Sequence, residues 1–499
     1  MTSPRESPPA VTRLSQATIG QLPEEVERPR YDRSAVRAGV VHLGIGAFHR
    51  AHQAVVLDDL VGRGDARWGI RAASLRSPAA RDALAPQDGL YSLVVRDGAE
   101  ERVRVIGSVL DVLVAPENPA ALVEALAAPE THIVTLTVTE KGYKLDPATG
   151  ALIETDPDVA SDLAGIQKPK TAPGFLVAAL DLRRKRGLAP FTAISCDNLP
   201  ENGRRLEAAV LAMAGHRDPA LRDWIAENGA FPQTMVDRIV PATDEDDIER
   251  LASRTGLLDR AMVKTEPFTQ WVIEDRFAGE RPDFEAAGAQ VTADVAPWET
   301  AKLRLLNGAH SGIAYLGALA VIAFVDRFVA TPAGSAFVEA LWDEAEATLA
   351  PPAELDVAAY RRALMARFAN SALGHRTRQI AMDGSQKLPQ RLVASLVARQ
   401  GQGLAAPMTS LAIAAWMRWQ AGRCDDGTRH VVDDPLADRT AAAWASAADP
   451  AEAARRLLAI DAIFPPALAA SPAADEIARW LEKLTREGAA ATLARHQRP

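Results

Sequence analysis

The segment from residue 301 to 311 brings an ammonium, an amide and an imidazole to helical spacing. It is rich in leucine and contains no proline, so we predict a helix. At about 100° per residue, Lys302, Asn307 and His310 share one side of that helix over roughly 16 Å. Glu299 joins them if the helix already begins there. A lysine can pass a proton to an oxygen, and an amide and an imidazole can hold the same substrate.

Polar groups beside leucines on a buried helix are costly unless they are paired, and that cost favours a ligand site. The alternative is a surface helix whose polar side faces water. The segment alone does not separate the two interpretations, and the elements that would bring a ligand to it have to be found elsewhere in the chain.

A glycine turn near the start of the chain could bind a dinucleotide. An apolar strand at 40–43 runs into Gly44 and Gly46, and a helical segment follows at 53–61. This order places backbone N–H groups and a helix N-terminus against a pyrophosphate. His49 stands where the usual fingerprint has its third glycine, so the generic motif is incomplete, and a plain loop is the alternative.

The second strand, predicted at 68–77, leaves the choice of cofactor open. NAD-binding folds often carry an acidic residue near the end of this strand, where it holds the adenine ribose hydroxyls. Here Arg76 and Ser77 occupy the tip and the first acid is Asp82, so a 2′-phosphate is also compatible.

A later strand is predicted to end in polar side chains. The strand at 132–139 is rich in β-branched residues and places Thr137, Thr139 and Glu140 at its carboxyl end, where parallel sheets bind ligands. Simple β-propensity would explain the threonines but not the charged end. We also predict a strand at 103–114 and a helix at 118–127.

The segment from 191 to 203 is predicted to be a strand that ends in a dense polar turn. Asn198 in this turn could offer its amide N–H to a substrate oxygen, or it could cap a helix that begins near 201. Asp237 follows another short strand, with a local ion pair to Arg238 as the alternative role. We also predict a helix at 175–186 and strands at 235–241 and 268–275.

A basic segment, residues 374–391, concentrates cations and amides around a glycine turn in an otherwise acidic chain. His375, Arg378 and Lys387 lie in it, and they favour an anionic or polyhydroxy ligand. A solvated basic loop is the alternative.

The length of 499 residues exceeds one ordinary core, so we expect two domains. The pattern of elements predicts a flexible arm at 1–25, an α/β domain at 26–290 and a mostly α-helical domain at 291–499. The arm lacks the apolar segment of a signal peptide, and no apolar run in the chain reaches the length of a membrane span.

Charge and cysteine content exclude several classes of partner. The net charge of −9 disfavours binding to nucleic acid or to an anionic membrane. Cys196 and Cys424 are far apart, which indicates neither a disulfide framework nor a structural zinc site and suits a reducing cytoplasm. We expect a cytoplasmic protein that binds no metal and is a monomer or a weak oligomer.

Together these motifs resemble the mannitol dehydrogenase family, the polyol-specific long-chain dehydrogenases and reductases. The matching stretches are 42–52, 135–143, 195–203, 234–243, 270–275, 302–311 and 383–389. The resemblance implies an α/β fold class: an N-terminal Rossmann-type doubly wound sheet, a mostly α-helical C-terminal domain, and a site in the cleft between them. It implies a small-molecule polyol or sugar acid as substrate and NAD as cofactor, with NADP as the alternative.

The resemblance also assigns roles to single residues. The catalytic residues would be Lys302, Asn198, Asn307 and His310. Substrate binding would fall to Asp237 and Lys387, to which we add Arg378 and His375 for a substrate carboxylate. The cofactor residues would be Gly44, Gly46, Phe48, His49, Arg50, Arg76, Thr137 and Thr139. The candidates for relaying a proton to water are Glu299 and Glu140.

Two departures from mannitol 2-dehydrogenases affect the expected substrate. Gln379 stands where those enzymes have an arginine, and Pro78-Ala79 replaces their acidic pair after the second strand. The stretches 139–143 and 379–391 are more similar to the fructuronate reductase (D-mannonate oxidoreductase) branch. We therefore expect interconversion of fructuronate and D-mannonate. The alternatives are a mannitol 2-dehydrogenase or other polyol dehydrogenase, and a non-catalytic sugar-acid or dinucleotide sensor.

The expected mechanism follows from the same residues. Lys302, as an ammonium, would donate a proton to the oxygen of the reduced carbonyl. In the reverse direction it must act as the neutral base, so burial should lower its pKa. Asn198 and Asn307 would hold that oxygen with amide N–H groups, an oxyanion hole worth about 2.7–4 kcal/mol per donor.

Overall fold

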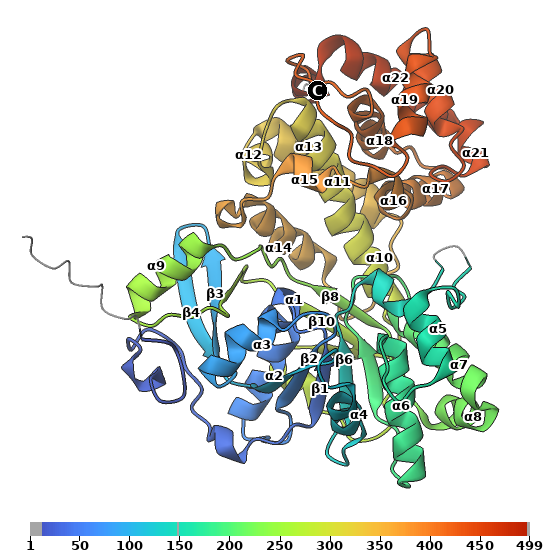
Figure 1. The fold of residues 1–499 in the computed structure, drawn as a ribbon. Coiled ribbons are helices and arrows are strands. Elements are labelled where there is room, and N and C mark those ends of the chain that lie inside the picture. The colour runs from blue at the N-terminus through green and yellow to red at the C-terminus, as the bar shows by residue number, and fades with distance from the viewer. Residues whose placement is uncertain (1–11, 147–148, 497–499) are drawn as a thin grey trace, which may run out of the picture. The chain divides into compact units, whose positions relative to one another are not determined.

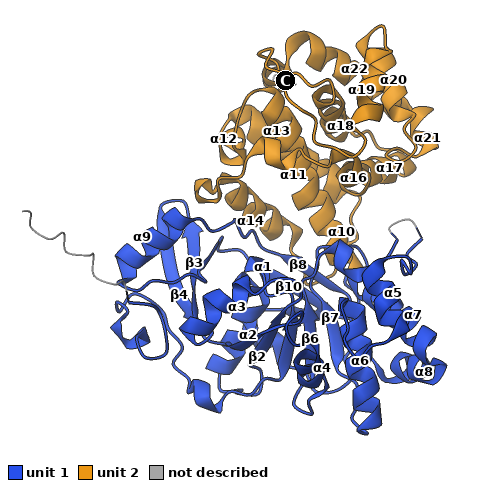
Figure 2. Ribbon diagram, viewed as in Figure 1, with its two compact units in different colours: residues 1–295 blue, residues 296–499 orange. Residues whose placement is uncertain are grey.

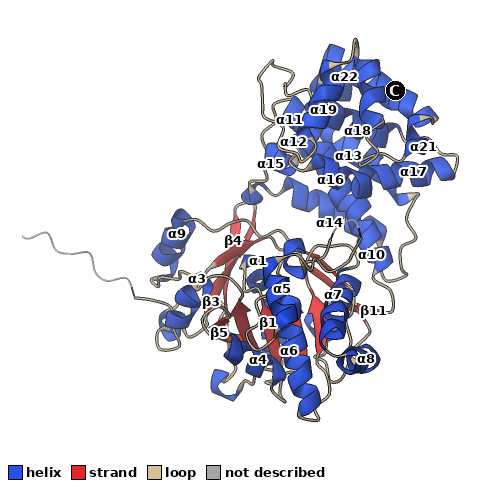
Figure 3. Cartoon of the chain, turned by 45° about the vertical axis from the view of Figure 1, so that its right-hand side comes forward, coloured by secondary structure: helices blue, strands red, loops and turns tan. Residues whose placement is uncertain are grey.

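The computed structural model describes residues 12–146 and 149–496. Contacts divide the chain into two compact units, residues 1–295 and 296–499 (Figure 2). Within the described residues every β-strand belongs to the first unit, and the second unit consists of helices and loops (Figure 3). This α/β first half and helical second half confirm the fold class expected from the sequence.

The first unit is built on a five-stranded parallel sheet with the strand order β5-β2-β1-β6-β7 (Figure 1). The strands are β1 (Val40–Leu43), β2 (Ile70–Ser74), β5 (Val109–Val114), β6 (Ile133–Leu136) and β7 (Thr192–Ser195). Their short, mostly apolar sequences suit a sheet that is covered on both faces. Parallel pairing brings the carboxyl ends to one edge, and the strand order reverses at β1, where such sheets bind ligands.

Alternating side chains of the strands form the two faces of the sheet. The covering helices are α2 (Gln53–Gly62), α4 (Pro119–Ala127), α6 (Ala172–Lys185) and α7 (Asn202–Arg217). Val41 and Leu43 of β1 pack with α4, α6 and α7, whereas Val40 packs with α2 on the other face. The period of two therefore places His42 on the same face as Val40, beneath the turn that follows β1.

Two three-stranded sheets complete the first unit. One contains β11 (Gln290–Thr292), β10 (Gln270–Glu274) and β8 (Thr234–Asp237), and the other contains β4 (Glu100–Ile106), β3 (Tyr91–Asp97) and β9 (Val263–Thr265). The strand predicted at 103–114 is wrong, because the chain breaks at Gly107 and its two parts join different sheets. A Cβ at Gly107 would lie 2.7 Å from Pro29 Cγ and 2.8 Å from the Tyr31 hydroxyl, so the crossing point is tightly packed.

Part of the expected N-terminal arm is packed, which corrects the prediction for residues 12–25. Leu14 and Leu22 are buried in a hydrophobic cluster of the first unit. The Leu14 N–H donates to the Leu258 carbonyl at 3.0 Å. The apolar residues of this segment are spaced too irregularly to form a helix or strand pattern, which is why the sequence did not indicate packing. Residues 1–11 of the arm lie outside the described residues.

The second unit begins with α10 (Ala296–Ala301), which continues into a π-helical segment, Lys302–Asn307, and then into α11 (Gly308–Leu319). A second π-helical segment, Pro389–Val393, follows α16 (Gly384–Leu388). The other helices named below are α13 (Pro332–Glu346), α14 (Val357–Ala369), α15 (Thr377–Ile380), α18 (Pro407–Trp419) and α22 (Pro472–Glu487). In the part of the chain that the structure describes, no helix is both long and apolar enough to cross a membrane.

Candidate active site

Two glycines form the turn after β1, and each is needed for a different reason. Gly44 has a φ of +98°, and a Cβ there would lie 2.2 Å from the Thr137 carbonyl oxygen of the neighbouring segment. Gly46 is exposed and is the N-cap residue of the short helix α1 (Ala47–Ala51). A Cβ at Gly46 would meet nothing closer than 3.9 Å, so its open side leaves room for a phosphate against the backbone.

A pair of stacked imidazoles supports this turn from below. His42 and His49 are fully buried, and their ring centroids are 3.3 Å apart. His42 Nδ1 lies 2.8 Å from the Thr135 hydroxyl and Nε2 lies 3.1 Å from the Gly44 carbonyl, so the proton belongs on Nε2. Burial lowers the pKa of His42 to about 3, so the ring is neutral. The side chain of His49, expected to bind the cofactor, is instead enclosed beneath the turn.

The other residues expected at the cofactor differ in how open they are. Arg50 donates to the carbonyls of Gly46, at 3.3 Å, and Ala261, so its guanidinium supports the turn. Phe48 is partly buried at the same turn. Arg76 is exposed just beyond β2 and has no ion-pair partner among the described residues, which leaves its charge available to an anionic group.

The carboxyl ends of β6 and β7 are tied together by Asp197. Its carboxylate accepts hydrogen bonds from the N–H groups of Val138 (3.1 Å) and Thr139 (2.8 Å) and from the Tyr143 hydroxyl (2.6 Å). These bonds hold Thr139 at a φ of +65°, which such residues rarely adopt. Burial raises the pKa of Asp197, and the hydrogen bonds oppose that shift. The network fixes the turn that carries Asn198.

Asn198 is exposed at the end of β7 and does not cap the helix that follows. Helix α7 begins at Asn202 with Glu201 as its N-cap residue, so the capping alternative is wrong. Glu140, a candidate for the proton relay, is exposed where the chain leaves β6.

Asp237 is buried at the end of β8, with 5% of its surface exposed. The neighbouring Arg238 donates to the main-chain carbonyls of Ala51 and Glu266. Burial lowers the pKa of this guanidinium to about 10. Arg238 therefore connects three segments of the first unit and has a structural role.

Lys302 and Asn307 begin and end the first π-helical segment, which the sequence did not predict. The Gly308 N–H donates to the Leu303 carbonyl, a step of five residues in place of four. The wider turn brings Asn307 more nearly above Lys302 than the separation of about 140° in an α-helix. Both side chains are buried, with 7% and 8% exposed, which excludes the surface-helix alternative. Glu299 is partly buried in α10, one turn earlier.

Trp342 of α13 supports this segment and the histidine that follows it. Its indole N–H donates to the Leu305 carbonyl at 2.8 Å. Its ring stacks on Phe368 at 6.0 Å, and Phe368 in turn contacts His310 at 4.7 Å between ring centroids. One buried tryptophan therefore positions both the backbone near Lys302 and the imidazole of His310.

His310 presents an unsatisfied nitrogen. Its Nε2 atom is buried and has no hydrogen-bond partner among the described residues. Burial lowers the pKa of the ring well below its usual value, and nearby His375, with its ring 5.7 Å away, lowers it further. A neutral imidazole with a free nitrogen can accept or donate a hydrogen bond to a substrate hydroxyl.

The basic segment contributes less to this region than the sequence indicated. The Lys387 ammonium donates to the Met382 carbonyl at 2.6 Å and so closes its own loop. Arg378 is exposed, and its Nη2 atom lies 3.6 Å from Cys424 Sγ. Of the three cations expected to bind a substrate carboxylate, the structure brings only His375 against His310.

Arg391, which was not among the predicted site residues, lies closer to the site. Its Nη1 atom is 3.4 Å from the hydroxyl of Ser311, the residue after His310. The only signal in the sequence was that Arg391 ends the basic segment, because the partner of a cation cannot be read from its neighbours in sequence.

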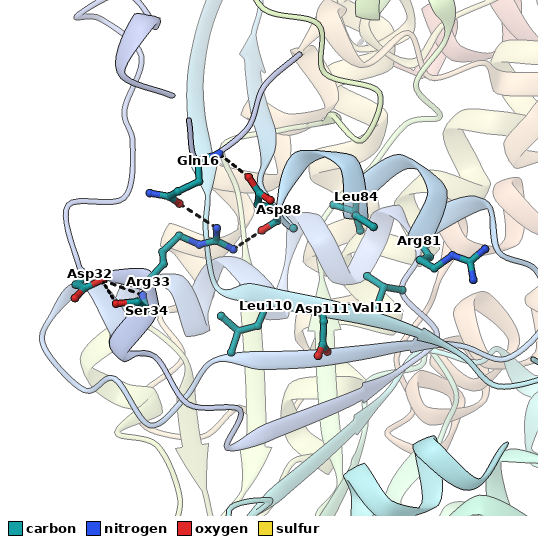
Figure 4. Close-up of a pocket in the computed structure, with 12 residues that line it drawn as sticks. Gln16, Asp32, Arg33, Ser34, Arg81, Leu84, Asp88, Leu110, Asp111 and Val112 are labelled. Atoms are coloured by element: carbon teal, nitrogen blue, oxygen red, sulfur yellow. Dashed lines mark hydrogen bonds between the residues drawn. The ribbon is translucent and has the colours of Figure 1, made fainter. Parts of the chain in front are cut away.

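A cavity of about 750 Å³ lies elsewhere, between α3 (Ala79–Leu84) and β5 at the edge of the parallel sheet (Figure 4). Arg33 there donates to Gln16 at 3.1 Å and to the Asp88 carbonyl at 2.7 Å, and Arg81 is paired with neighbouring carboxylates. Its arginines are thus already paired, and none of the predicted site residues lines it.

Comparison with known proteins covers both units. The family model described as the mannitol dehydrogenase Rossmann domain matches residues 38–286, and the mannitol dehydrogenase C-terminal domain matches residues 294–485. The D-mannonate oxidoreductase of Escherichia coli K12 is 44% identical over 417 residues, which cover 82% of this chain and 86% of that protein. The mannitol 2-dehydrogenase of Phaeosphaeria nodorum is 38% identical over 502 residues, which cover 99% and 87%.

A solved structure gives the same result. It is the Pseudomonas fluorescens mannitol 2-dehydrogenase in a ternary complex with NAD and D-mannitol. It matches with a TM-score of 0.83 and 38% identity, over 98% of this chain and 100% of that chain. Full-length similarity, the glycine turn and the polar face of the first π-helical segment agree: the chain belongs to the mannitol dehydrogenase family.

Proposed function

We propose that this NAD-dependent dehydrogenase interconverts fructuronate and D-mannonate. The support is its 44% identity to a D-mannonate oxidoreductase, together with the similarity of residues 379–391 to that branch. The observation that carries the catalytic part is the buried polar face of the first π-helical segment, where Lys302 and Asn307 lie beside a neutral His310.

The reaction consumes one ketone, one NADH and one proton, and yields one secondary alcohol and one NAD. The turn at Gly44 and Gly46 would hold the pyrophosphate, because its open side accepts a phosphate and its backbone is fixed by Thr137. When bound, the reduced nicotinamide supplies the hydride that adds to the keto carbon. The residues of this chain then have to place the carbonyl and deliver the proton.

Lys302 is proposed as the proton donor to the carbonyl oxygen, on which negative charge develops as the carbon is reduced. Asn307 and Asn198 would orient that oxygen with amide N–H groups, which cannot themselves take the proton. His310, being neutral, would bond a neighbouring hydroxyl through its unpartnered Nε2 atom. Asp237 is the candidate for a second hydroxyl, and Glu299 and Glu140 are the candidates for returning protons to water.

A mannitol 2-dehydrogenase is the second candidate function. It is supported by the 38% identity, over nearly the whole chain, to proteins of that name in Phaeosphaeria nodorum and Pseudomonas fluorescens. The two candidates share every proposed catalytic residue and differ in whether the substrate ends in a carboxylate.

A panel of keto sugars tests the choice. The purified chain is assayed by NADH absorbance with fructuronate, tagaturonate, fructose and sorbose, and the panel is repeated with NADPH. We expect kcat/KM for fructuronate to exceed that for fructose by at least tenfold, with NADH preferred. A preference for fructose would replace the proposal with the mannitol 2-dehydrogenase. No oxidation of either cofactor with any sugar would favour a sensor.

A further inference from the structure

A partly buried guanidinium in the second unit has no counter-ion. Arg391 lies in the second π-helical segment, and its Nη1 atom makes one long contact, 3.4 Å, with the Ser311 hydroxyl. Burial lowers the pKa of this guanidinium, and within the described residues no carboxylate lies near enough to oppose that shift. A guanidinium carries five N–H donors, so most of its capacity for hydrogen bonds is unused.

A paired arginine in the same unit looks different. Arg361 of α14 contacts three carboxylates, those of Glu339 at 2.7 Å, Asp343 at 2.8 Å and Glu346 at 2.8 Å. Withdrawing a cation from water without such partners is costly, so Arg391 is best explained by a ligand that supplies the missing negative charge.

The surroundings of Arg391 carry charge of the same sign. Burial lowers the pKa of His310, and cationic neighbours that include Arg391 lower it further. Burial also lowers the pKa of Lys387, and Arg391 is again the next cause. Asp383 and Asp434 oppose this shift at Lys387 but do not reach Arg391. The region therefore favours an anion over a neutral group.

Arg391 also reaches the helix face that carries the proposed catalytic residues. Ser311 lies one α-helical turn after Asn307, so the two share a face, and it directly follows His310. The Arg391 carbonyl oxygen lies 3.0 Å from the position of a Cβ on Gly308, so the two π-helical segments are in close contact here.

We propose that Arg391 binds the terminal carboxylate of a sugar-acid substrate, and that this makes the chain prefer sugar acids over polyols. The inference rests on the proposed function, whose substrate class it specifies. Three carbinol carbons separate the carboxylate of fructuronate from its keto carbon, so different residues must hold the two groups. The planar guanidinium can bind both carboxylate oxygens at once, whereas the ammonium of Lys387 is a point charge already bonded to Met382.

Binding of two matched ligands tests this role without turnover. D-Mannonate and D-mannitol have the same carbon skeleton and differ in a carboxylate against a hydroxymethyl group. Each is titrated calorimetrically into the full chain saturated with NADH, which cannot accept a hydride from either ligand. Wild type should bind mannonate more tightly than mannitol. Arg391→Gln should weaken mannonate binding by roughly 10- to 150-fold and mannitol binding by less than roughly twofold.

Two further variants control for charge and geometry. Arg391→Lys keeps the charge and loses the fork, so its mannonate affinity should fall between those of wild type and Arg391→Gln. Arg479→Gln removes an exposed cation of α22 and should change neither affinity.

The outcomes separate this role from the proposed function. Equal binding of the two ligands by wild type, equal losses for both in Arg391→Gln, or an unchanged affinity for mannonate would overturn the role of Arg391. If Arg391→Gln does not fold, Arg391→Lys decides, because it must lose mannonate affinity while keeping mannitol affinity. A turnover preference for fructose would instead refute the proposed function while mannonate still bound through Arg391.

Discussion

Replacement of Trp342 by phenylalanine should disturb the catalytic segment from outside the substrate site. The indole N–H of Trp342 is the donor to the Leu305 carbonyl inside the first π-helical segment, at 2.8 Å. A phenylalanine keeps an aromatic ring against Phe368 but cannot donate this bond. The π-helical turn loses a contact that holds it, and Lys302 begins the same turn.

The expected loss of stability follows from two terms. A buried carbonyl left without its donor costs about 1–3 kcal/mol. The smaller ring leaves a space near the carbonyl that costs about 1 kcal/mol more. In a protein unit of about 200 residues, 1 kcal/mol shifts the Tm by roughly 2–4 °C. We therefore expect the transition of the second unit to fall by about 4–16 °C, and kcat to fall by up to about 100-fold through displacement of Lys302 and Asn307.

A matched tryptophan isolates the hydrogen bond. Trp416 of α18 is also fully buried, and its indole N–H has no partner among the described residues. Trp416→Phe should therefore show only the smaller packing loss. Scanning calorimetry measures both variants, and single-turnover reduction of the keto sugar measures the effect on chemistry. Equal shifts in Tm for the two variants, or wild-type kcat in Trp342→Phe, would refute the role of the Leu305 bond.

Two further predictions concern the first unit. Gly44→Ala should weaken NADH binding at least tenfold in a fluorescence titration, because its Cβ would lie 2.2 Å from the Thr137 carbonyl, whereas Gly46→Ala should keep the wild-type Tm. Tyr143→Phe removes a 2.6 Å donor from Asp197, whose pKa burial already raises, and should raise that pKa further. A raised carboxyl pKa contributes stability below the unfolded pKa and loses it as pH rises through the folded pKa, so the drop in Tm relative to wild type should be larger at neutral pH than near pH 4.

Much of the first unit could be predicted because its chemistry is local. The apolar strand before Gly44 and the β-branched segment ending at Thr139 each carry their pattern within a few residues, and both elements are present in the structure. The strand predicted at 103–114 failed because apolar alternation continues across Gly107, and only packing against Pro29 and Tyr31 reveals the break.

The details of the second unit could not be predicted for a related reason. An α-helix and a π-helix accept the same residues, and the extra residue per turn at Lys302–Asn307 depends on distant contacts such as the Trp342 indole. A cation in sequence gives no sign of its partner. Lys387 bonds its own loop, whereas Arg391, which the same segment contains, has no carboxylate near it among the described residues.

The most direct test of the proposed chemistry is Lys302→Ala, measured with fructuronate and NADH by single-turnover kinetics. If Lys302 delivers the proton, hydride transfer should slow by about 10²–10⁴-fold while the Kd for NADH stays at its wild-type value. Wild-type rates of hydride transfer in this variant, with normal cofactor binding, would contradict the assignment of Lys302 as the general acid.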